Sequence, residues 1–310
     1  MRTGRFFRVR FSLLSRPAPW RRLQSWRNFW DASGRSATAS APPHEERGNR
    51  GKSSGPRCVV FPVQAHFNRT PLPSDLIADQ KVLLEPSIRL LHALVDVISS
   101  NGWLVPALSA MEICQAVVQA MTTAALGGGN ATQCSALKQL PHFTDELVEQ
   151  AKEMGVDDIF DLMNMDEKER EKLLKPLTPS QLKDVAKASN RYPVVNVEFQ
   201  VSKKDDVLPN ENLQCTVTLE RDCAEETSGA VYAPYFPREK EEQWWLVVGR
   251  ASSNSLAAIK RLSLNKPTTT VTLSFEAPET DGKHSYVLYL MGDSYVGGDQ
   301  EYKFDVRVRS

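Results

Sequence analysis

The chain has 310 residues, 41% hydrophobic and 25% charged, a composition typical of a globular protein that buries a core. Its 38 basic and 38 acidic residues cancel, but residues 1–57 carry 13 Arg and Lys against 3 Asp and Glu, whereas residues 58–310 carry 25 against 35. The two parts therefore have net charges of +10 and −10, and the acidic part is unsuited to holding nucleic acid by phosphate neutralisation alone. No stretch approaches the roughly 18 apolar residues of a membrane-spanning helix, which argues against such a segment.

The beginning of the chain is rich in Arg, Ser, Pro and Trp and poor in acidic residues. Such a composition is typical of an organelle transit peptide, and it equally suits a disordered leader or a first exon that was assigned incorrectly. We expect residues 1–62 to form a disordered basic leader.

Helical spacing of apolar residues begins after this leader. A period near 3.6 predicts a helix over residues 71–100, apolar on nearly all sides and so packed on more than one side. Gly102 suits the end of this helix, and Pro106 suits the first turn of a second helix that runs to about residue 125, where LGGGNAT breaks it. Residues 63–136 are therefore predicted to be a helical region.

Residues 137–192 contain several short helical patterns. Thr144 and Asp145 begin the first, and Thr178 is placed to cap the last, with Pro179 at its first helical position. The strings VDDIFDLMNM and DEKEREKLL supply two more short helices between them. Short helices joined by a turn that contains glycine predict a helix-loop-helix unit.

The spacing of apolar residues changes from 3.6 to 2 at Tyr192-Pro193. Short alternating segments separated by Pro, Gly, Asn and Asp predict an antiparallel β-sandwich over residues 193–310, and hence an α+β chain of several modules. The candidate strands are VVNVEFQV, LQCTVTLE, GAVYAPYF, QWWLVVGR, SLAAIKRLSL, TTTVTLSFEA, SYVLYLMG and EYKFDVRVR.

Two adjacent tryptophans lie in one of these strands. Trp244 and Trp245 must point to opposite faces of the sheet, so one belongs to the core and the other covers a neighbouring module or lines an exposed patch. The five cysteines are scattered and odd in number, and none forms a C-x-x-C pair. We therefore expect neither a disulfide framework nor a zinc ribbon, and a reducing nuclear or cytosolic environment.

No catalytic constellation is apparent. The string from Gly48 to Ser53 reads G-x-x-G-K-S, two residues short of the spacing with which a P-loop wraps phosphates. His92 lies on an apolar helix and is expected to be a packing residue, and none of the five histidines has a second ligand at a useful spacing. We expect no catalytic residue, no metal and no cofactor.

Several strings nevertheless resemble one family in the same order along the chain. They are VDVISSNGWLVPALSAMEICQAVVQAM, LKQLPHF, LKDVAKASNRYP, EEQWWLVVGRASSNSLAAIKRLSL and YLMGDSYVGGDQEYKFDV. They resemble the Sec-63 homology domain, in the version that ends the C-terminal cassette of the spliceosomal DExH RNA helicase of the U-five small nuclear ribonucleoprotein. The resemblance covers about residues 63–308 and does not include the helicase motor.

The resemblance implies a helical bundle over residues 63–136, a helix-loop-helix over residues 137–192 and an immunoglobulin- or fibronectin-like sandwich over residues 193–310. It also implies a ratchet helix that lies along RNA, for which Leu104–Met121 is the candidate, with Gln115 and Gln119 as RNA-facing side chains. The sandwich is implied to bind proteins. The candidate interaction surface is formed by aromatic side chains, namely Trp244, Trp245 and Tyr295.

The resulting hypothesis is a non-catalytic accessory and protein-interaction module of a spliceosomal RNA helicase, a truncated form without the ATPase domains. Its expected partners are helicase motor domains and spliceosomal proteins, with RNA as a further possibility and no membrane, and its expected location is the nucleus. Three alternatives stay open: an RNA-binding module that uses the leader and the bundle helix, an endoplasmic-reticulum protein-translocation component, and a cytoplasmic or organellar location. An autonomous helicase is disfavoured because the P-loop is missing.

Overall fold

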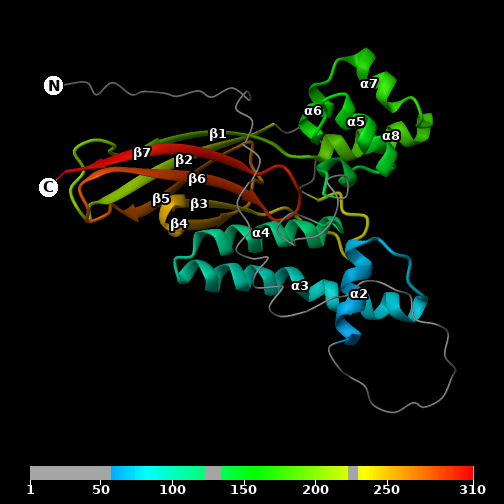
Figure 1. The fold of residues 1–310 in the computed structure, drawn as a ribbon, viewed down its shortest axis with the longest axis horizontal. Helices are drawn as coiled ribbons and strands as arrows, with labels where there is room; N and C mark the ends of the chain where they lie inside the picture. Colours follow the sequence, from blue (N-terminus) through cyan, green and yellow to red (C-terminus); the bar gives the residue numbers. More distant parts are fainter. Residues whose placement is uncertain (1–56, 123–133, 223–229, 310) are drawn as a thin grey trace, which may run out of the picture.

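The structure is a computed structural model that describes residues 57–122, 134–222 and 230–309. Figure 1 shows the strands layered at one end, with α3 and α4 running side by side against them and α5–α8 gathered apart from that helix pair. The helices of the described residues are α2 (Arg57–Phe67), α3 (Ser74–Ser100), α4 (Leu104–Gln119), α5 (Asp145–Glu153), α6 (Ile159–Asn164), α7 (Glu167–Leu174) and α8 (Pro179–Arg191). None of them is long and apolar enough to cross a membrane.

The first long helices agree with the sequence pattern except at their ends. Helix α3 ends at Ser100 as expected but begins at Ser74, and Pro106 lies in the first turn of α4 as expected. Helix α4 ends at Gln119 and not near residue 125, because Ala120 takes a left-handed conformation with φ 49° and returns its N–H to the Ala116 carbonyl. Residues 57–62 of the predicted leader are helical, since they belong to α2, and residues 1–56 lie outside the described part.

The first and the last of the four short helices begin where their capping residues predicted. The Thr144 hydroxyl accepts from the Leu147 N–H at the start of α5, which has acidic residues in its first turn. Thr178 and Gln181 form a reciprocal capping box at the start of α8, with Pro179 at the first helical position. Local signals of this kind do not depend on tertiary contacts, which is why the sequence predicts them well.

Seven strands form two antiparallel sheets in the described residues, so the α+β class is confirmed. One sheet has the order β1-β2-β5 and the other β4-β3-β6-β7, and we call them together the two-sheet body. The strands are β1 (Val194–Val201), β2 (Asn212–Asp222), β3 (Trp244–Arg250), β4 (Ser255–Leu262), β5 (Thr268–Glu276), β6 (Gly282–Gly292) and β7 (Gln300–Val308). The immunoglobulin-like, helical-bundle and helix-loop-helix assignments, and the domain boundaries, remain predictions.

One predicted strand is wrong. Among the described residues of GAVYAPYF, Ala230 makes only an isolated bridge to Glu241, and the rest belong to no strand. The Tyr232 N–H donates to the Tyr295 hydroxyl at 2.9 Å, and its carbonyl accepts from the Gln119 side chain at 3.2 Å. The backbone N–H and carbonyl of Tyr232, which a sheet ladder would need, are thus bonded to side chains.

Two hydrophobic cores meet at the sheet that contains β3. One lies between the two sheets and includes Trp244, Leu246 and Val248. The other lies between the helices and the outer face of the same sheet, and includes Trp245 and Val247. Alternation along one strand therefore joins the helices and the two-sheet body into a single packed unit.

Candidate interaction site at the junction of helices and sheet

Trp244 and Trp245 occupy opposite faces of β3, as their adjacency predicted. Trp244 is 2% exposed and lies between the sheets, where its Nε1 donates to Glu242 at 3.3 Å. Glu242 also forms a buried ion pair with Arg221. Trp245 is 1% exposed under the helices. Neither ring belongs to an exposed interaction surface, because each fills a core.

The Trp245 ring lies against His92 of α3. The two rings meet edge to face with centroids 5.1 Å apart, and the Arg261 guanidinium lies 5.6 Å from the Trp245 ring centroid. Arg261 also reaches back to Asp96 of α3 at 2.9 Å. His92 is therefore a packing residue, as expected, but one that also has a charged partner.

That partner is Asp293, whose carboxylate is fully buried just after β6. It lies 3.1 Å from His92 Nε2 and accepts from Lys240 Nζ at 2.6 Å and from the Gln243 N–H at 3.0 Å. Burial by itself would raise the pKa of Asp293, but His92, Lys240 and the Ser294 hydroxyl hold its pKa below the ordinary value. His92 of α3 and Lys240, in the segment before β3, therefore compensate the buried negative charge of Asp293.

The two glutamines proposed to face RNA are each 2% exposed and point into the protein. Gln115 Nε2 donates to the Gly292 carbonyl and to the Asp299 carboxylate, each at 2.9 Å. Gln119 Nε2 donates to the Ser294 carbonyl at 2.8 Å. This arrangement corrects the sequence-based expectation, because both amides are occupied by the chain between β6 and β7.

Two carboxyl groups near Gln115 titrate abnormally. Burial raises the pKa of Asp299 to about 6, although the bonds from Gln115 and from the Gly292 N–H at 2.8 Å favour its ionised form. Burial, and then the charge of Asp299, raise the pKa of Glu112 to about 7. Perturbed carboxyls in a cleft often mark catalysis, but these two lie inside a helix–sheet contact.

Residues 293–299, which we call the β6–β7 loop, are also bonded by side chains that do not belong to α4. The Gln139 side chain donates to the Val296 carbonyl at 2.7 Å and accepts from its N–H at 2.8 Å. The Tyr192 hydroxyl donates to the same carbonyl at 3.0 Å, and the Tyr192 ring meets the Tyr295 ring with centroids 5.2 Å apart. Tyr295 is 5% exposed, so it too serves this junction and not a free surface.

Sequence reasoning did not find Asp293, Asp299 and Gln139. All three act through partners far along the chain, so their spacing carries no signal. The string GDSYVGGDQ between two strands has two aspartates and two adjacent glycines, but such residues are common in loops between strands and did not single out a site. That string contains the β6–β7 loop.

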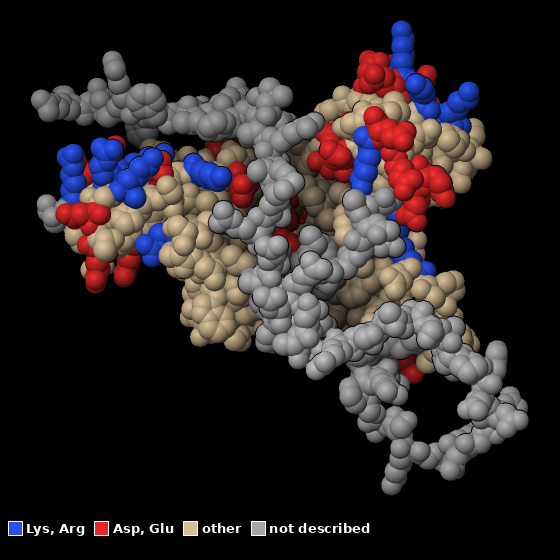
Figure 2. Space-filling view, viewed as in Figure 1, with Lys and Arg blue, Asp and Glu red and all other residues tan. Residues whose placement is uncertain are grey.

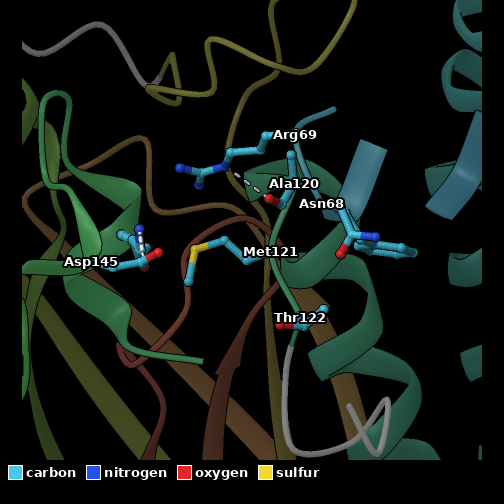
Figure 3. A pocket seen from close by; sticks show the side chains of 8 residues that line it. Asn68, Arg69, Ala120, Met121, Thr122 and Asp145 are labelled. Carbon is cyan, nitrogen blue, oxygen red and sulfur yellow. Dashed lines mark hydrogen bonds and ion pairs between the residues drawn. The ribbon is translucent and has the colours of Figure 1, made fainter. Parts of the chain in front are cut away.

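A pocket of about 250 Å³ lies at the end of α4. Arg69 donates to the Ala120 and Gln119 carbonyls at 3.0 Å each and stacks 4.4 Å from the Tyr235 ring centroid. Figure 3 shows Arg69, Met121 and Asp145 lining it from separate segments. The Arg69 guanidinium satisfies carbonyls that the helix end leaves open, which is a structural role.

A second hollow is a groove of about 390 Å³ between α6, α7 and α8, mostly apolar in its lining. Leu182 of α8 is 36% exposed at its edge, and the Arg170 side chain donates to the Met163 carbonyl at 3.3 Å. Its apolar lining residues are Leu162, Met163, Leu174, Leu182, Val185 and Ala186. Within the described ranges, no group of three or more His, Cys, Asp or Glu could hold a metal ion.

Comparison with known proteins bears on this arrangement. Residues 59–305 match the Sec63 Brl domain, which is most of the chain and includes the junction around the β6–β7 loop. The chain belongs to the Sec63 Brl domain family. This finding confirms the resemblance that the sequence strings indicated.

Individual relatives of this Sec63 Brl domain are much longer proteins. The human U5 small nuclear ribonucleoprotein 200 kDa helicase is 47% identical over 247 residues, which are 80% of this chain and 11% of the relative. The Arabidopsis thaliana DExH-box ATP-dependent RNA helicase DExH12 is 43% identical over 251 residues, again 80% of this chain and 11% of the relative. A Dictyostelium discoideum protein, activating signal cointegrator 1 complex subunit 3-like, is 37% identical over 252 residues, which are 78% of this chain and 11% of that protein. The chain thus spans about a ninth of these relatives.

Proposed function

We propose that this Sec63 Brl domain is a non-catalytic protein-interaction module that works with a spliceosomal U5 helicase. The support is the 47% identity to a U5 helicase segment and the absence of a P-loop string from the sequence. The relatives' whole length is nine times that of the matched part, so their ATP-dependent activity is not assigned to this chain.

The observation that carries the proposal is the engagement of α4 inside the protein. Its buried glutamines hold the β6–β7 loop, which leaves α4 without a free polar face for RNA. The groove between α6, α7 and α8 remains open, with an apolar lining and charged side chains at its rim. An open apolar groove with a polar edge is suited to the apolar face of a partner helix.

Capture from nuclear extract with the tagged full chain tests this function. We expect U5 ribonucleoprotein proteins to be recovered, and we expect Leu182→Glu to reduce their recovery, because it places a charge at the edge of the groove. Leu208→Glu is the matched control, since Leu208 is 58% exposed and lies in the connection between β1 and β2. Recovery of no splicing proteins by the unaltered chain would refute the module, and equal losses with both variants would refute the groove.

A second candidate function is RNA binding through the basic residues 1–57, favoured by their 13 Arg and Lys. Binding of this kind would be weak and sensitive to salt, because it would depend on phosphate neutralisation. Removal of residues 1–56 should abolish it, whereas Gln115→Ala should not affect it. RNA affinity that survived the removal would favour the folded part as the binding site.

The expected location, the nucleus, belongs to the same proposal. Imaging of the full chain with a C-terminal fluorescent tag tests it, since that tag leaves the first residues free. Accumulation in an organelle would instead support the transit-peptide interpretation, and a reticular pattern would support the translocation alternative.

A further inference from the structure

Helix α3 has an apolar stripe that no described residue covers. Val82 is 72% exposed, Leu90 is 65%, Leu94 is 44% and Val97 is 60%. At 100° per residue these positions fall within an arc of about 120°, opposite the buried side of the helix, and span about 22 Å of its length. In Figure 2 no charged side chain is seen on the end of the α3–α4 pair that the grey atoms leave uncovered. We call these four residues the α3 stripe.

Exposed leucines and valines scattered singly need no explanation, but aligned ones do. The α3 stripe lies on the outward side of the helix, and the opposite side packs through Leu84, Ile88 and Val95 into the core. A second row of apolar side chains on one helix indicates a second packing partner.

The chain itself contains a segment of matching chemistry. Residues 1–30 hold eleven Val, Leu, Phe and Trp residues and eight Arg, with no Asp or Glu. Residues 31–56 contain no Val, Ile, Leu, Met, Phe, Trp or Tyr at all. The first segment therefore has apolar surface to bury, and the second has the composition of a flexible connection.

The attachment point favours α3 over the other exposed apolar surfaces. Residue 56 leads directly into α2, and α2 packs on α3, where the Gln80 side chain donates to the Pro62 carbonyl at 2.8 Å. A polar connection of 26 residues has a root-mean-square length of about 25–30 Å, similar to the length of the stripe. The resulting local concentration is on the order of millimolar, so weak contacts suffice for docking.

The charges are complementary as well. Helix α3 carries four acidic residues against two basic ones, and residues 58–310 have a net charge of −10 against +8 for residues 1–30. We propose that residues 1–30 dock on the α3 stripe of the same chain, with their aromatic side chains against Val82, Leu90, Leu94 and Val97.

Limited trypsin digestion of the intact full chain, followed by mass spectrometry, tests this docking. Arg21 and Arg27 lie in the docking segment, whereas Arg35 and Arg47 lie in the polar connection and serve as internal controls. We expect cleavage at the first pair to be about tenfold slower than at the second, the factor that 1.4 kcal/mol of docking free energy gives. The double variant Leu90→Ser/Val97→Ser should abolish the difference.

Leu208→Ser supplies the matched control, because Leu208 is similarly exposed, at 58%, but lies in the connection between β1 and β2; it should leave the protection unchanged. Trp20→Ser/Trp26→Ser/Trp30→Ser provides a variant outside the described residues that should expose the segment while leaving the circular dichroism of the folded part unaltered. Equal cleavage at all four arginines of the unaltered chain would overturn the proposal. Protection that persists in the α3 double variant, or that rises with protein concentration, would also overturn it, the latter by indicating a second copy as the occupant.

Discussion

The Gln115 side-chain amide donates to the Asp299 carboxylate at 2.9 Å, across 184 residues of sequence. The bond joins the C-terminal half of α4 to the last residue of the β6–β7 loop. Gln119 reaches the same loop from α4, and Gln139 reaches it from the segment before α5. The β6–β7 loop is thus hydrogen-bonded both to α4 and to the segment before α5.

Loss of the Gln115 side chain should therefore destabilise the whole unit. Gln115→Ala leaves the half-buried Asp299 carboxylate with the Gly292 N–H alone, which we expect to lower the free energy of unfolding by about 1–3 kcal/mol. Urea denaturation followed by tryptophan fluorescence measures the change. Gln150→Ala on the exposed face of α5 is the control, with an effect within about 0.5 kcal/mol. Equal effects of the two would show that the bond contributes nothing.

The pKa of Glu112 predicts an unusual pH dependence. It is about 7 in the folded protein against 4.5 ordinarily, so the folded state binds more protons than the unfolded state between these values. The free energy of unfolding should then fall as the pH rises through this window. Asp299, with its pKa raised to about 6, acts in the same direction.

Glu112→Gln tests this dependence directly. The variant should be more stable than the unaltered chain by about 1–2 kcal/mol near pH 8, and the difference should vanish near pH 4, where Glu112 is protonated in both states. Urea midpoints across this range supply the measurement, with Glu149→Gln on the exposed surface of α5 as the control. Parallel curves for Glu112→Gln and the unaltered chain would exclude a buried, perturbed carboxyl.

A close approach between α4 and β3 requires glycine. A Cβ atom on Gly249 would lie 2.6 Å from Leu104 Cδ1 and 2.7 Å from Cδ2, and Leu104 is 1% exposed. We expect Gly249→Ala to cost about 1–3 kcal/mol through overpacking. Leu104→Ala alone should cost about 2–5 kcal/mol through the cavity that it leaves.

The double variant Gly249→Ala/Leu104→Ala separates overpacking from a general strand effect. Its loss should be smaller than the sum of the single losses by more than about 0.5 kcal/mol, because the added methyl enters space that Leu104 vacates. Additive losses in denaturation experiments would show that the two sites do not compete for space.

The buried Asp293 carboxylate predicts a conventional acid dependence. Its pKa is lowered, so it stabilises the folded state above the ordinary pKa and loses this contribution as the pH falls through the folded value. Asp293→Asn leaves Lys240 without its charged partner and should cost about 3 kcal/mol at neutral pH. The cost should shrink below about pH 4. Asp206→Asn, which breaks an exposed ion pair with Arg309, should cost at most about 1 kcal/mol by the same thermal or urea assay.

Local patterns predicted most of the elements correctly. Capping residues such as Thr144 and Thr178 set helix starts, and alternation of apolar residues located seven strands. The opposite orientation of Trp244 and Trp245 followed from the pleat alone. These signals lie within a few residues of the structure that they specify, so a single sequence contains them.

Features that depend on distant partners were predicted wrongly or missed. Gln115 and Gln119 interrupt an apolar helix, and the sequence cannot say whether such amides meet water, RNA or another part of the chain. The segment after residue 229 has strand-like residues, but the Tyr232 backbone bonds to the side chains of Gln119 and Tyr295 and not to a neighbouring strand. In both cases the deciding contact comes from more than 60 residues away in the sequence.

Because β3 packs on both of its faces, the choice of fragment boundaries for expression of this protein matters. A fragment that starts at residue 193 would keep both sheets but bare the side chains that now lie under α3 and α4, among them Trp245, Val247, Tyr289 and Met291. Such a fragment would expose a large apolar surface and would aggregate in solution. Cloning boundaries for expression are better placed before α2 than between helix and strand.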